Sequence, residues 1–254
     1  MPSLNVELHG TGSPLLWLHG FTQTNSSAHV FTSILAAHCA LATPDLPGHG
    51  QARDLRGNLE EISDLVADVL PRTPCDLGGY SFGGRVALHV ALRHPEKIRR
   101  LILLSATRGI EDIDERRSRR ERDERLAERI ELIGTDSFID EWLAQPMFEG
   151  LANDEVERNA RRRQSPLGLA SSLRLAGTGT QEWLGEKIES LTMPVLLMAG
   201  ERDEKFLREA VAMASDIPGA RCVVIANAGH AAHLEQPDAV ANAILEFLDE
   251  ANAQ

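Results

Sequence analysis

A serine between glycines lies at the centre of the most distinctive short motif, residues 79–84 (GYSFGG). The motif follows an apolar run and precedes a helical pattern, which is the setting of a nucleophile on a sharp strand-to-helix turn. Glycines on both sides of Ser81 let neighbouring chain approach it closely. The same letters also arise by chance in glycine-rich turns, so the motif predicts nucleophilic chemistry only together with suitable partners.

An aspartate and a histidine that could activate Ser81 follow later apolar runs. Asp203 comes after the run at residues 195–200, and His230 comes after the run at 222–226. We predict that His230 takes a proton from the Ser81 hydroxyl or from a substrate, while Asp203 orients the imidazole and stabilises its cation. The alternative is a surface aspartate in a Glu-Arg-Asp string and a structural histidine.

Two backbone N–H groups are candidates for stabilising negative charge beside this serine. Phe82 directly follows the serine, and Phe21 follows a His-Gly pair at the end of an early apolar run. Donors in these two places form an oxyanion hole in hydrolases that use such a turn. A plain tight turn is the alternative at Phe21, and we expect structural roles for the turn cluster at residues 45–50 and for His233.

Short apolar runs bounded by Gly and Pro alternate with helical patterns along the chain. This alternation predicts an α/β fold with a mostly parallel sheet and crossover helices. Helices are predicted at residues 59–70, where Asn58 and Glu61 have N-cap and N3 character, and at 82–93, which Pro95 helps to end. The predicted strands are residues 15–18, 40–43, 75–79, 101–105, 195–199 and 222–226.

The strand-helix rhythm stops between about residues 107 and 190. This segment is rich in Arg and Glu, has almost no β-branched runs and contains several patterns of helical length. The rhythm resumes after Met193 and Pro194. We therefore predict a single domain in which residues 1–106 and 191–254 form the core and the intervening segment forms a helical lid.

Composition excludes several classes of partner. A formal net charge of −12 over 254 residues argues against binding to nucleic acid or to an anionic membrane surface. No apolar stretch is long enough to span a membrane, and the first residues lack the pattern of a signal peptide, so we expect a cytoplasmic protein. Cys39, Cys75 and Cys222 are too widely spaced to indicate a disulfide framework or a zinc site.

The longer strings around these candidate residues resemble 2-succinyl-6-hydroxy-2,4-cyclohexadiene-1-carboxylate synthase of menaquinone biosynthesis, a family within the α/β-hydrolase superfamily. The resemblance extends over nearly the whole chain. The Arg after the serine motif and the strings of the lid are more specific than the serine motif itself. The strings are residues 79–87 (GYSFGGRVA), 172–174 (SLR), 177–181 (GTGTQ), 200–206 (GERDEKF) and 228–233 (AGHAAH).

The resemblance implies an α/β-hydrolase fold that carries out an elimination. Members of this family expel pyruvate from 5-enolpyruvoyl-6-hydroxy-2-succinyl-cyclohex-3-ene-1-carboxylate, a step in the synthesis of menaquinone or phylloquinone. Ser81 activated by His230 would supply the base, and the oxyanion hole would stabilise an enolate. The reaction requires no metal and no organic cofactor. The expected partner is a small molecule with three carboxylates.

An acidic protein needs local positive charge to bind such a substrate, and the guanidinium group suits carboxylates through its paired donors. The resemblance implies that Arg85, an arginine of the first lid helix and Arg163 of the later lid bind the substrate. It also implies that Trp142 and Tyr80 shape the pocket. Lid packing is the alternative for Trp142.

The first lid helix carries too many arginines for all of them to face one cavity at 3.6 residues per turn. Arg119 fits the family spacing to Asp123 and Ala127, and Arg120 is the alternative. We expect most of the others to form a solvated face that pairs with the glutamates of the helix.

Two other functions use the same residues. A serine hydrolase, either a carboxylesterase or a carbon-carbon bond hydrolase, would combine this triad with water as the second substrate. A binding protein on the same scaffold would need no chemistry, but such a protein usually lacks one of the three triad residues, and this sequence has all of them. The arginine-rich lid favours the lyase over an esterase, whose lid often presents an apolar acyl site.

Overall fold

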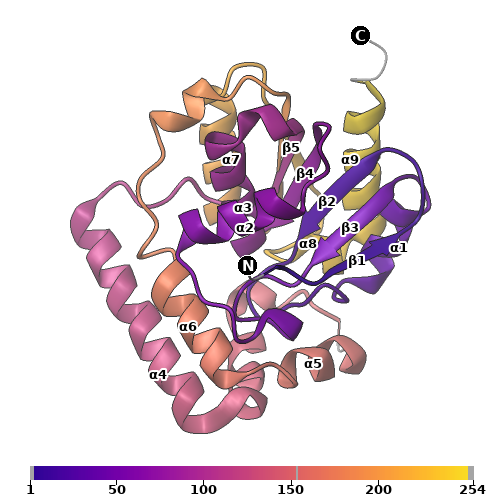
Figure 1. Ribbon diagram of the computed structural model, residues 1–254. Coiled ribbons are helices and arrows are strands. Elements are labelled where there is room, and N and C mark those ends of the chain that lie inside the picture. Colours follow the sequence, from indigo (N-terminus) through magenta and orange to yellow (C-terminus); the bar gives the residue numbers. More distant parts are fainter. Residues whose placement is uncertain (1–2, 153, 251–254) are drawn as a thin grey trace.

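A single β-sheet forms the centre of the computed structural model, which describes residues 3–152 and 154–250 (Figure 1). Within these residues its seven strands are β1 (Val6–His9), β2 (Pro14–Leu18), β3 (Ala40–Pro44), β4 (Cys75–Tyr80), β5 (Ile98–Leu104), β6 (Val195–Gly200) and β7 (Arg221–Ile225). Their order is β1-β3-β2-β4-β5-β6-β7, and only β1 pairs antiparallel to its neighbour. The predicted strands and the mostly parallel sheet are confirmed, whereas β1 is an additional strand.

Helices cover both faces of the sheet (Figure 1). They are α1 (His29–Ala36), α2 (Leu59–Val69), α3 (Phe82–Arg93), α7 (Glu204–Asp216), α8 (Ala232–Glu235) and α9 (Pro237–Glu250), with short 3-10 turns η1 (Gly50–Ala52) and η2 (Pro95–Lys97). Helices α2, α3 and α7 pack on one face, and α1 and α9 pack on the other. No helix in the described parts of the chain has the length and apolar character needed to cross a membrane.

Strand β2 illustrates how one apolar run supplies both layers of the core. Leu16 and Leu18 belong to the cluster under α2 and α3, whereas Leu15 and Trp17 belong to the cluster under α1 and α9. Successive side chains of a strand point to opposite faces of the sheet, so a strand with apolar residues at every position is buried on both sides. The carboxyl ends of the parallel strands are thereby held rigidly at one edge.

The segment expected to form a lid is helical and lies across that edge (Figure 1). It contains α4 (Ile113–Leu143), η3 (Pro146–Phe148), α5 (Glu155–Arg162), α6 (Pro166–Ala176) and η4 (Lys187–Ser190). Helix α4 is interrupted at Gly134, whose φ of 74° lies in the left-handed region. The lid has an apolar cluster of its own between α4 and α6: Ala127, Ile130, Phe138, Ile139, Leu169, Ala170 and Leu173.

The predicted N-terminal cap of α2 is present. The Asn58 side chain accepts a hydrogen bond from the Glu61 N–H (3.0 Å), and the Glu61 carboxylate accepts one from the Asn58 N–H (2.9 Å). This reciprocal arrangement satisfies two N–H groups that the helix itself leaves unpaired. It begins α2 at the residue that the sequence predicts.

Candidate active site

Ser81 occupies the turn between β4 and α3 in a backbone conformation that serine rarely adopts (φ 52°, ψ −107°). A Cβ at Gly83 would lie 2.2 Å from the Leu18 carbonyl oxygen, and one at Gly79 would lie 2.5 Å from the Gly83 carbonyl oxygen. Only glycine therefore fits on either side of the serine. The Ser81 N–H donates to the Leu104 carbonyl (2.8 Å), which fixes the turn against β5.

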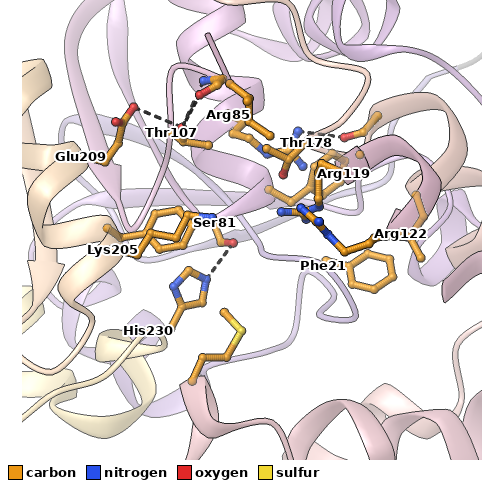
Figure 2. Close-up of a pocket in the computed structure, with 18 of the residues that line it drawn as sticks. Phe21, Ser81, Arg85, Thr107, Arg119, Arg122, Thr178, Lys205, Glu209 and His230 are labelled. Carbon is orange, nitrogen blue, oxygen red and sulfur yellow. Dashed lines mark hydrogen bonds between the residues drawn. The ribbon is translucent and has the colours of Figure 1, made fainter. Parts of the chain in front are cut away.

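The structure brings the three predicted triad residues together, and Figure 2 shows two of them, Ser81 and His230. The His230 Nδ1–H group donates to Asp203 Oδ2 at 2.6 Å, and His230 Nε2 lies 3.1 Å from Ser81 Oγ. The Ser105 hydroxyl, at the end of β5, donates to the His230 carbonyl at 3.0 Å and holds the loop that carries the histidine. Nε2 is thus the free base that faces the serine hydroxyl, as nucleophile activation or proton abstraction requires.

The hydrogen-bonded pair of Asp203 and His230 is shielded from water. The His230 side chain is 3% exposed and that of Asp203 is 10% exposed. The Phe206 ring packs against the imidazole with 4.5 Å between ring centroids, and the Phe206 N–H caps Asp203 Oδ1 at 3.4 Å. Low local polarity strengthens the attraction between the carboxylate and an imidazolium that forms during a reaction.

The two candidate oxyanion donors lie beside Ser81 at the cavity wall. Phe82 is the first residue of α3, where N–H groups have no acceptor inside the helix and the helix dipole favours negative charge. Within the described residues, the Phe21 N–H has no protein acceptor either. Both N–H groups are therefore available to an oxygen that develops negative charge.

A cavity of about 960 Å³ opens above Ser81 between the core and the lid. Its wall contains four cations, namely Arg85 on α3, Arg119 and Arg122 on α4, and Lys205 at the start of α7. Figure 2 shows the two lid arginines on the same side of Ser81 as Phe21, with Lys205 on the other side. The same wall also carries five carboxylates, namely those of Glu111, Asp112, Glu115, Asp203 and Glu209, so its charge is mixed and the four cations are its positive part.

Arg85 lies deep in this cavity. Its guanidinium donates to the Ala176 carbonyl (2.9 Å) and packs over the Phe82 ring at 5.4 Å. Burial, with a smaller contribution from the nearby charge of Arg119, lowers the pKa of Arg85 to about 9. The side chain still carries its charge at neutral pH, and a bound anion would relieve the repulsion between the two guanidinium groups.

The arginines of α4 separate into those that face the cavity and those that face water. Arg119 lines the cavity and pairs with the buried Asp123 (2.8 Å), whereas Arg120 is exposed to solvent. Of the two residues left open by the sequence, the structure thus places Arg119 in the cavity. Arg122 also lines it, one helical turn beyond Arg119.

Trp142, near the end of lid helix α4, forms part of the cavity wall. Its indole packs edge-on against Phe21 at 5.3 Å and lies 5.8 Å from Phe148 of η3. The same ring therefore contributes both to lid packing and to the shape of the cavity, which were the two roles considered from the sequence. Contact with Phe21 joins the lid to the loop of the candidate oxyanion donor.

Tyr80 lies behind the triad, and this corrects the expectation that it shapes the pocket. Its ring packs 4.2 Å from that of His233 and 5.4 Å from that of His230, and a Cβ at Gly20 would lie 2.6 Å from it. Tyr80 belongs to the apolar cluster on the α1 and α9 face of the sheet, and it is not among the residues of the cavity wall. Burial raises the pKa of Tyr80 well above its usual range.

Arg163 also lies outside the cavity, contrary to expectation. It is exposed at the C-terminal end of α5, and it is not among the residues of the cavity wall. Arg161 is the buried arginine of this helix. Two positions along a helix correspond to a rotation of about 200°, so these two side chains face opposite directions.

Arg122 and Lys205 are cavity residues that sequence reasoning did not single out. For each of them, a sequence pattern could have indicated its place in the cavity. Arg122 stands three residues after Arg119, on the same face of α4. Lys205 lies in the family-like string at residues 200–206, two positions after Asp203.

Three buried histidines near the site have structural hydrogen bonds. His19 Nε2 accepts from the Leu46 N–H (3.0 Å), His49 Nε2 accepts from the Thr22 N–H (3.3 Å), and His233 Nε2 accepts from the Gln23 amide (3.1 Å). Burial lowers the pKa of His19 to about 4 and those of His49 and His233 to about 3, so all three are neutral at pH 7. In residues 3–152 and 154–250, no group of three or more His, Cys, Asp or Glu residues is placed to hold a metal ion.

Comparison with known proteins agrees with this geometry. The family model described as "Alpha/beta hydrolase family" matches residues 15–243. The chain belongs to the alpha/beta hydrolase family. Its fold class, expected from the sequence, is thereby confirmed.

Relatives within this family carry a common name. The chain is 36% identical over 243 residues to the putative 2-succinyl-6-hydroxy-2,4-cyclohexadiene-1-carboxylate synthase of Bacillus subtilis, covering 91% of this chain and 88% of the relative. It is 30% identical to the synthase of Photorhabdus laumondii, covering 92% and 84%. The solved structure of MenH from S. aureus matches with a TM-score of 0.91 at 33% identity, covering 98% of this alpha/beta hydrolase and 99% of MenH.

A solved structure with another activity in its name is also similar. The thermophilic esterase from Thermogutta terrifontis superposes with a TM-score of 0.83 at 28% identity, over 97% of this chain and 93% of the esterase. Proteins named for different activities therefore share this fold, and the residues that line the cavity must distinguish between the two reactions.

Proposed function

We propose that the protein is a carbon-oxygen lyase that eliminates pyruvate from 5-enolpyruvoyl-6-hydroxy-2-succinyl-cyclohex-3-ene-1-carboxylate. The product is 2-succinyl-6-hydroxy-2,4-cyclohexadiene-1-carboxylate, an intermediate of menaquinone or phylloquinone synthesis. One observation carries the proposal: a complete and shielded Ser-His-Asp relay opens into a cavity with four cations. The names of the relatives support the same reaction.

The first step is removal of a ring proton next to the succinyl ketone. Ser81 Oγ faces the cavity and can give its own proton to His230 Nε2 while it accepts the proton from carbon. The imidazolium that forms is stabilised by Asp203 at 2.6 Å. The electron pair of the broken carbon-hydrogen bond moves into the ring and the ketone oxygen, so an enolate develops.

The enolate is stabilised by the Phe21 and Phe82 N–H groups, because an oxyanion hole suits an enolate oxygen as well as a tetrahedral intermediate. Collapse of the enolate forms the second ring double bond and breaks the carbon-oxygen bond to the enolpyruvyl group. The leaving enolate of pyruvate takes the proton held at the triad, which restores Ser81 and His230. Atoms and charge then balance without a cofactor.

Three substrate carboxylates need cationic partners. Arg85, Arg119, Arg122 and Lys205 supply these on opposite sides of the serine. Charge-assisted hydrogen bonds to carboxylates are about twice as strong as neutral ones, and the cavity partly excludes water. We therefore infer that these four residues select a small polyanionic substrate and orient it over Ser81.

Comparing pyruvate release with ester cleavage tests the proposal. Purified enzyme is given the enolpyruvyl substrate in one assay and a short-chain nitrophenyl ester in the other. We expect fast pyruvate release by the wild type, a loss of about 10³-fold or more in Ser81→Ala with the fold intact, and negligible ester turnover. Pyruvate release at a near-wild-type rate by a folded Ser81→Ala variant would remove the serine from the mechanism.

A serine esterase is the second candidate. The distance of 3.1 Å between Ser81 Oγ and His230 Nε2 also suits formation of an acyl-enzyme, and the esterase of Thermogutta terrifontis has the same fold. The lid face of the cavity mixes apolar residues such as Leu126 and Leu173 with two arginines, and the arginines are what favours the lyase over an esterase. Efficient ester cleavage without pyruvate release would favour this candidate.

We also propose that the enzyme acts in the cytoplasm on a small-molecule substrate. The similarity to proteins named as synthases supports this proposal, and the protein carries a formal net charge of −12. The same negative charge supports a function without nucleic acid or an anionic membrane surface as a partner.

A further inference from the structure

The loop that carries the candidate donor Phe21 contains a strained residue. Gly20 to Gln23 form a turn, which the Gln23 N–H closes on the Gly20 carbonyl at 3.1 Å. The third residue of this turn, Thr22, has a φ of 69° and is fully buried. A turn of this kind favours glycine or asparagine at that position, and a β-branched residue there is unfavourable. Contacts around Thr22 must therefore hold the turn in this form.

Arg161 of lid helix α5 makes one of these contacts. Its Nη1–H group donates to Thr22 Oγ1 at 2.6 Å, and its side chain is 3% exposed. Glu157, one helical turn earlier, pairs with the Arg161 guanidinium, with 3.0 Å between Glu157 Oε1 and Arg161 Nη2. The same carboxylate accepts a hydrogen bond from the Ala28 N–H (3.2 Å). Burying an arginine is unfavourable unless its N–H groups have acceptors. The position of Arg161, and with it that of α5, therefore depends on the contact with Thr22.

Gln164, between α5 and α6, makes further contacts with the turn. Its amide nitrogen donates to the Thr22 carbonyl (3.1 Å) and to the Gln23 carbonyl (2.8 Å). Its amide oxygen accepts from the Gly50 N–H (2.8 Å). Two donors and one acceptor on a single rigid group match a primary amide, whereas a carboxylate or an apolar side chain cannot reproduce them.

The core completes the arrangement from the opposite side. The Thr22 N–H donates to His49 Nε2, and the Gly20 N–H donates to Gln23 Oε1 at 2.9 Å. All polar groups of Thr22 thus have partners, and two of its three partner groups belong to the lid. The orientation of the peptide groups on either side of Phe21 depends on these bonds.

We propose that Arg161 and Gln164 are positioning residues for catalysis: they hold the turn at residues 20–23 in the conformation on which the Phe21 N–H donor depends. The inference rests on the role of Phe21 in the proposed function. It assigns to the α5–α6 junction a part in the chemistry, although neither residue lines the substrate cavity. Without these contacts the strained turn relaxes, and the donor moves away from the developing negative charge.

Near-isosteric variants test the proposal through the split between kcat and KM. We expect Gln164→Leu and Arg161→Met each to lower kcat for pyruvate release about 10-fold or more, with KM changed less than about twofold. The reason is that loss of one oxyanion donor lowers kcat by about 10²–10³-fold, and a displaced donor loses part of that effect. Arg161→Lys keeps a donor near Thr22 Oγ1 and should recover part of kcat.

A matched control separates catalysis from lid stability. Arg162, the neighbour of Arg161, binds Asp136 and Asp140 of α4 at the surface. Arg162→Gln weakens the attachment of α5 to α4 but leaves the turn untouched, so kcat should stay at the wild-type value. A merely structural role for Gln164 would lower the melting temperature in Gln164→Leu and leave the kcat of the folded enzyme unchanged, and that result would overturn the proposal.

Phosphonylation of Ser81 by a fluorophosphonate provides a readout that does not depend on the natural substrate. Attack by Ser81 places a negative oxygen in the same hole, so Gln164→Leu should slow the reaction about 10-fold or more, as followed by mass spectrometry. If the wild type is phosphonylated but releases no pyruvate, the proposed function is wrong and slow phosphonylation of the variant still supports the positioning role. Equal phosphonylation rates in both proteins, or no phosphonylation of the wild type, would overturn the positioning role.

Discussion

Asp203 determines which nitrogen of His230 is free to act as a base. Its carboxylate accepts the Nδ1 proton at 2.6 Å, and this leaves Nε2 unprotonated towards Ser81. An amide in its place can donate to Nδ1 and so favours the tautomer that has its proton on Nε2. In the proposed mechanism the reactivity of the serine therefore depends on a residue that does not touch the substrate carbon.

Asp203→Asn tests this dependence. We expect the fold to be intact and kcat for pyruvate release to fall about 10³–10⁴-fold, because the imidazole can no longer accept a proton from Ser81. Steady-state kinetics beside the exposed neighbour variant Glu204→Gln give the comparison. A kcat within tenfold of wild type in Asp203→Asn would show that the base does not require this tautomer.

Arg85→Ala is expected to weaken productive binding. A charge-assisted hydrogen bond contributes about 1.5–3 kcal/mol, which corresponds to a loss of about 10- to 100-fold in kcat/KM, mainly through KM. Arg93→Ala is the matched control, because Arg93 ends the same helix and pairs with Asp64 at the surface. An unchanged kcat/KM in Arg85→Ala would exclude Arg85 from substrate binding.

The residues of the triad were predictable because their chemical types stand at the ends of strands. Which way a side chain faces was harder to predict. Tyr80 packs into the apolar cluster under α1 and α9 instead of the cavity wall, and Arg163 faces water because of the rotation of α5. The roles of Thr22 and Gln164 have no sequence signal, since their partners lie about 140 residues away along the chain.

Helix α2 offers a test at the scale of one element. Asn58→Ala removes the acceptor of the capping box and should lower the free energy of unfolding by about 1 kcal/mol. Asn58→Asp keeps an acceptor and should restore most of the loss. Denaturant unfolding measures both, and activity should be unchanged because α2 supplies no residue to the cavity. Equal stability of Asn58→Ala and wild type would show that the box contributes nothing.

Strand β1 and helix α1 are two elements that the sequence does not predict. The six predicted strands carry dense apolar runs, because both faces of the sheet are covered. Strand β1 has only four residues, and Leu8 is 78% exposed, so its sequence lacks such a run. Helix α1 begins after Ala28, which has a left-handed backbone and no side-chain cap, and the usual start signal is therefore missing. Tertiary contacts rather than local preference determine both elements.

The whole molecule should lose stability in mild acid. The pKa values of His19, His49 and His233 lie at about 3–4 in the folded protein, below about 6.5 in an unfolded chain. As the pH falls from about 6.5 to about 4, the unfolded chain binds protons that the folded protein does not. The free energy of unfolding therefore decreases, by up to about 1.4 kcal/mol per pH unit for each histidine.

Urea unfolding at a series of pH values between 7 and 4.5 measures this slope. His233→Gln keeps an acceptor for the Gln23 amide but cannot titrate, so it should flatten the slope by about one proton. His29→Gln, at an exposed position, serves as the control and should leave the slope unchanged. A slope in His233→Gln equal to that of the wild type would show that His233 does not titrate in this window.

The amide of Gln164 and the guanidinium of Arg161 complete the hydrogen bonding of a turn about 140 residues earlier. The lid and the turn are therefore expected to be compatible only when both come from the same protein. Recombination between two members of the family that exchanges residues 107–190 alone would separate partners that fit only each other. Such a chimaera could bury its apolar surfaces well and still be inactive. If the positioning proposal holds, transfer of residues 20–25 along with the lid should restore activity.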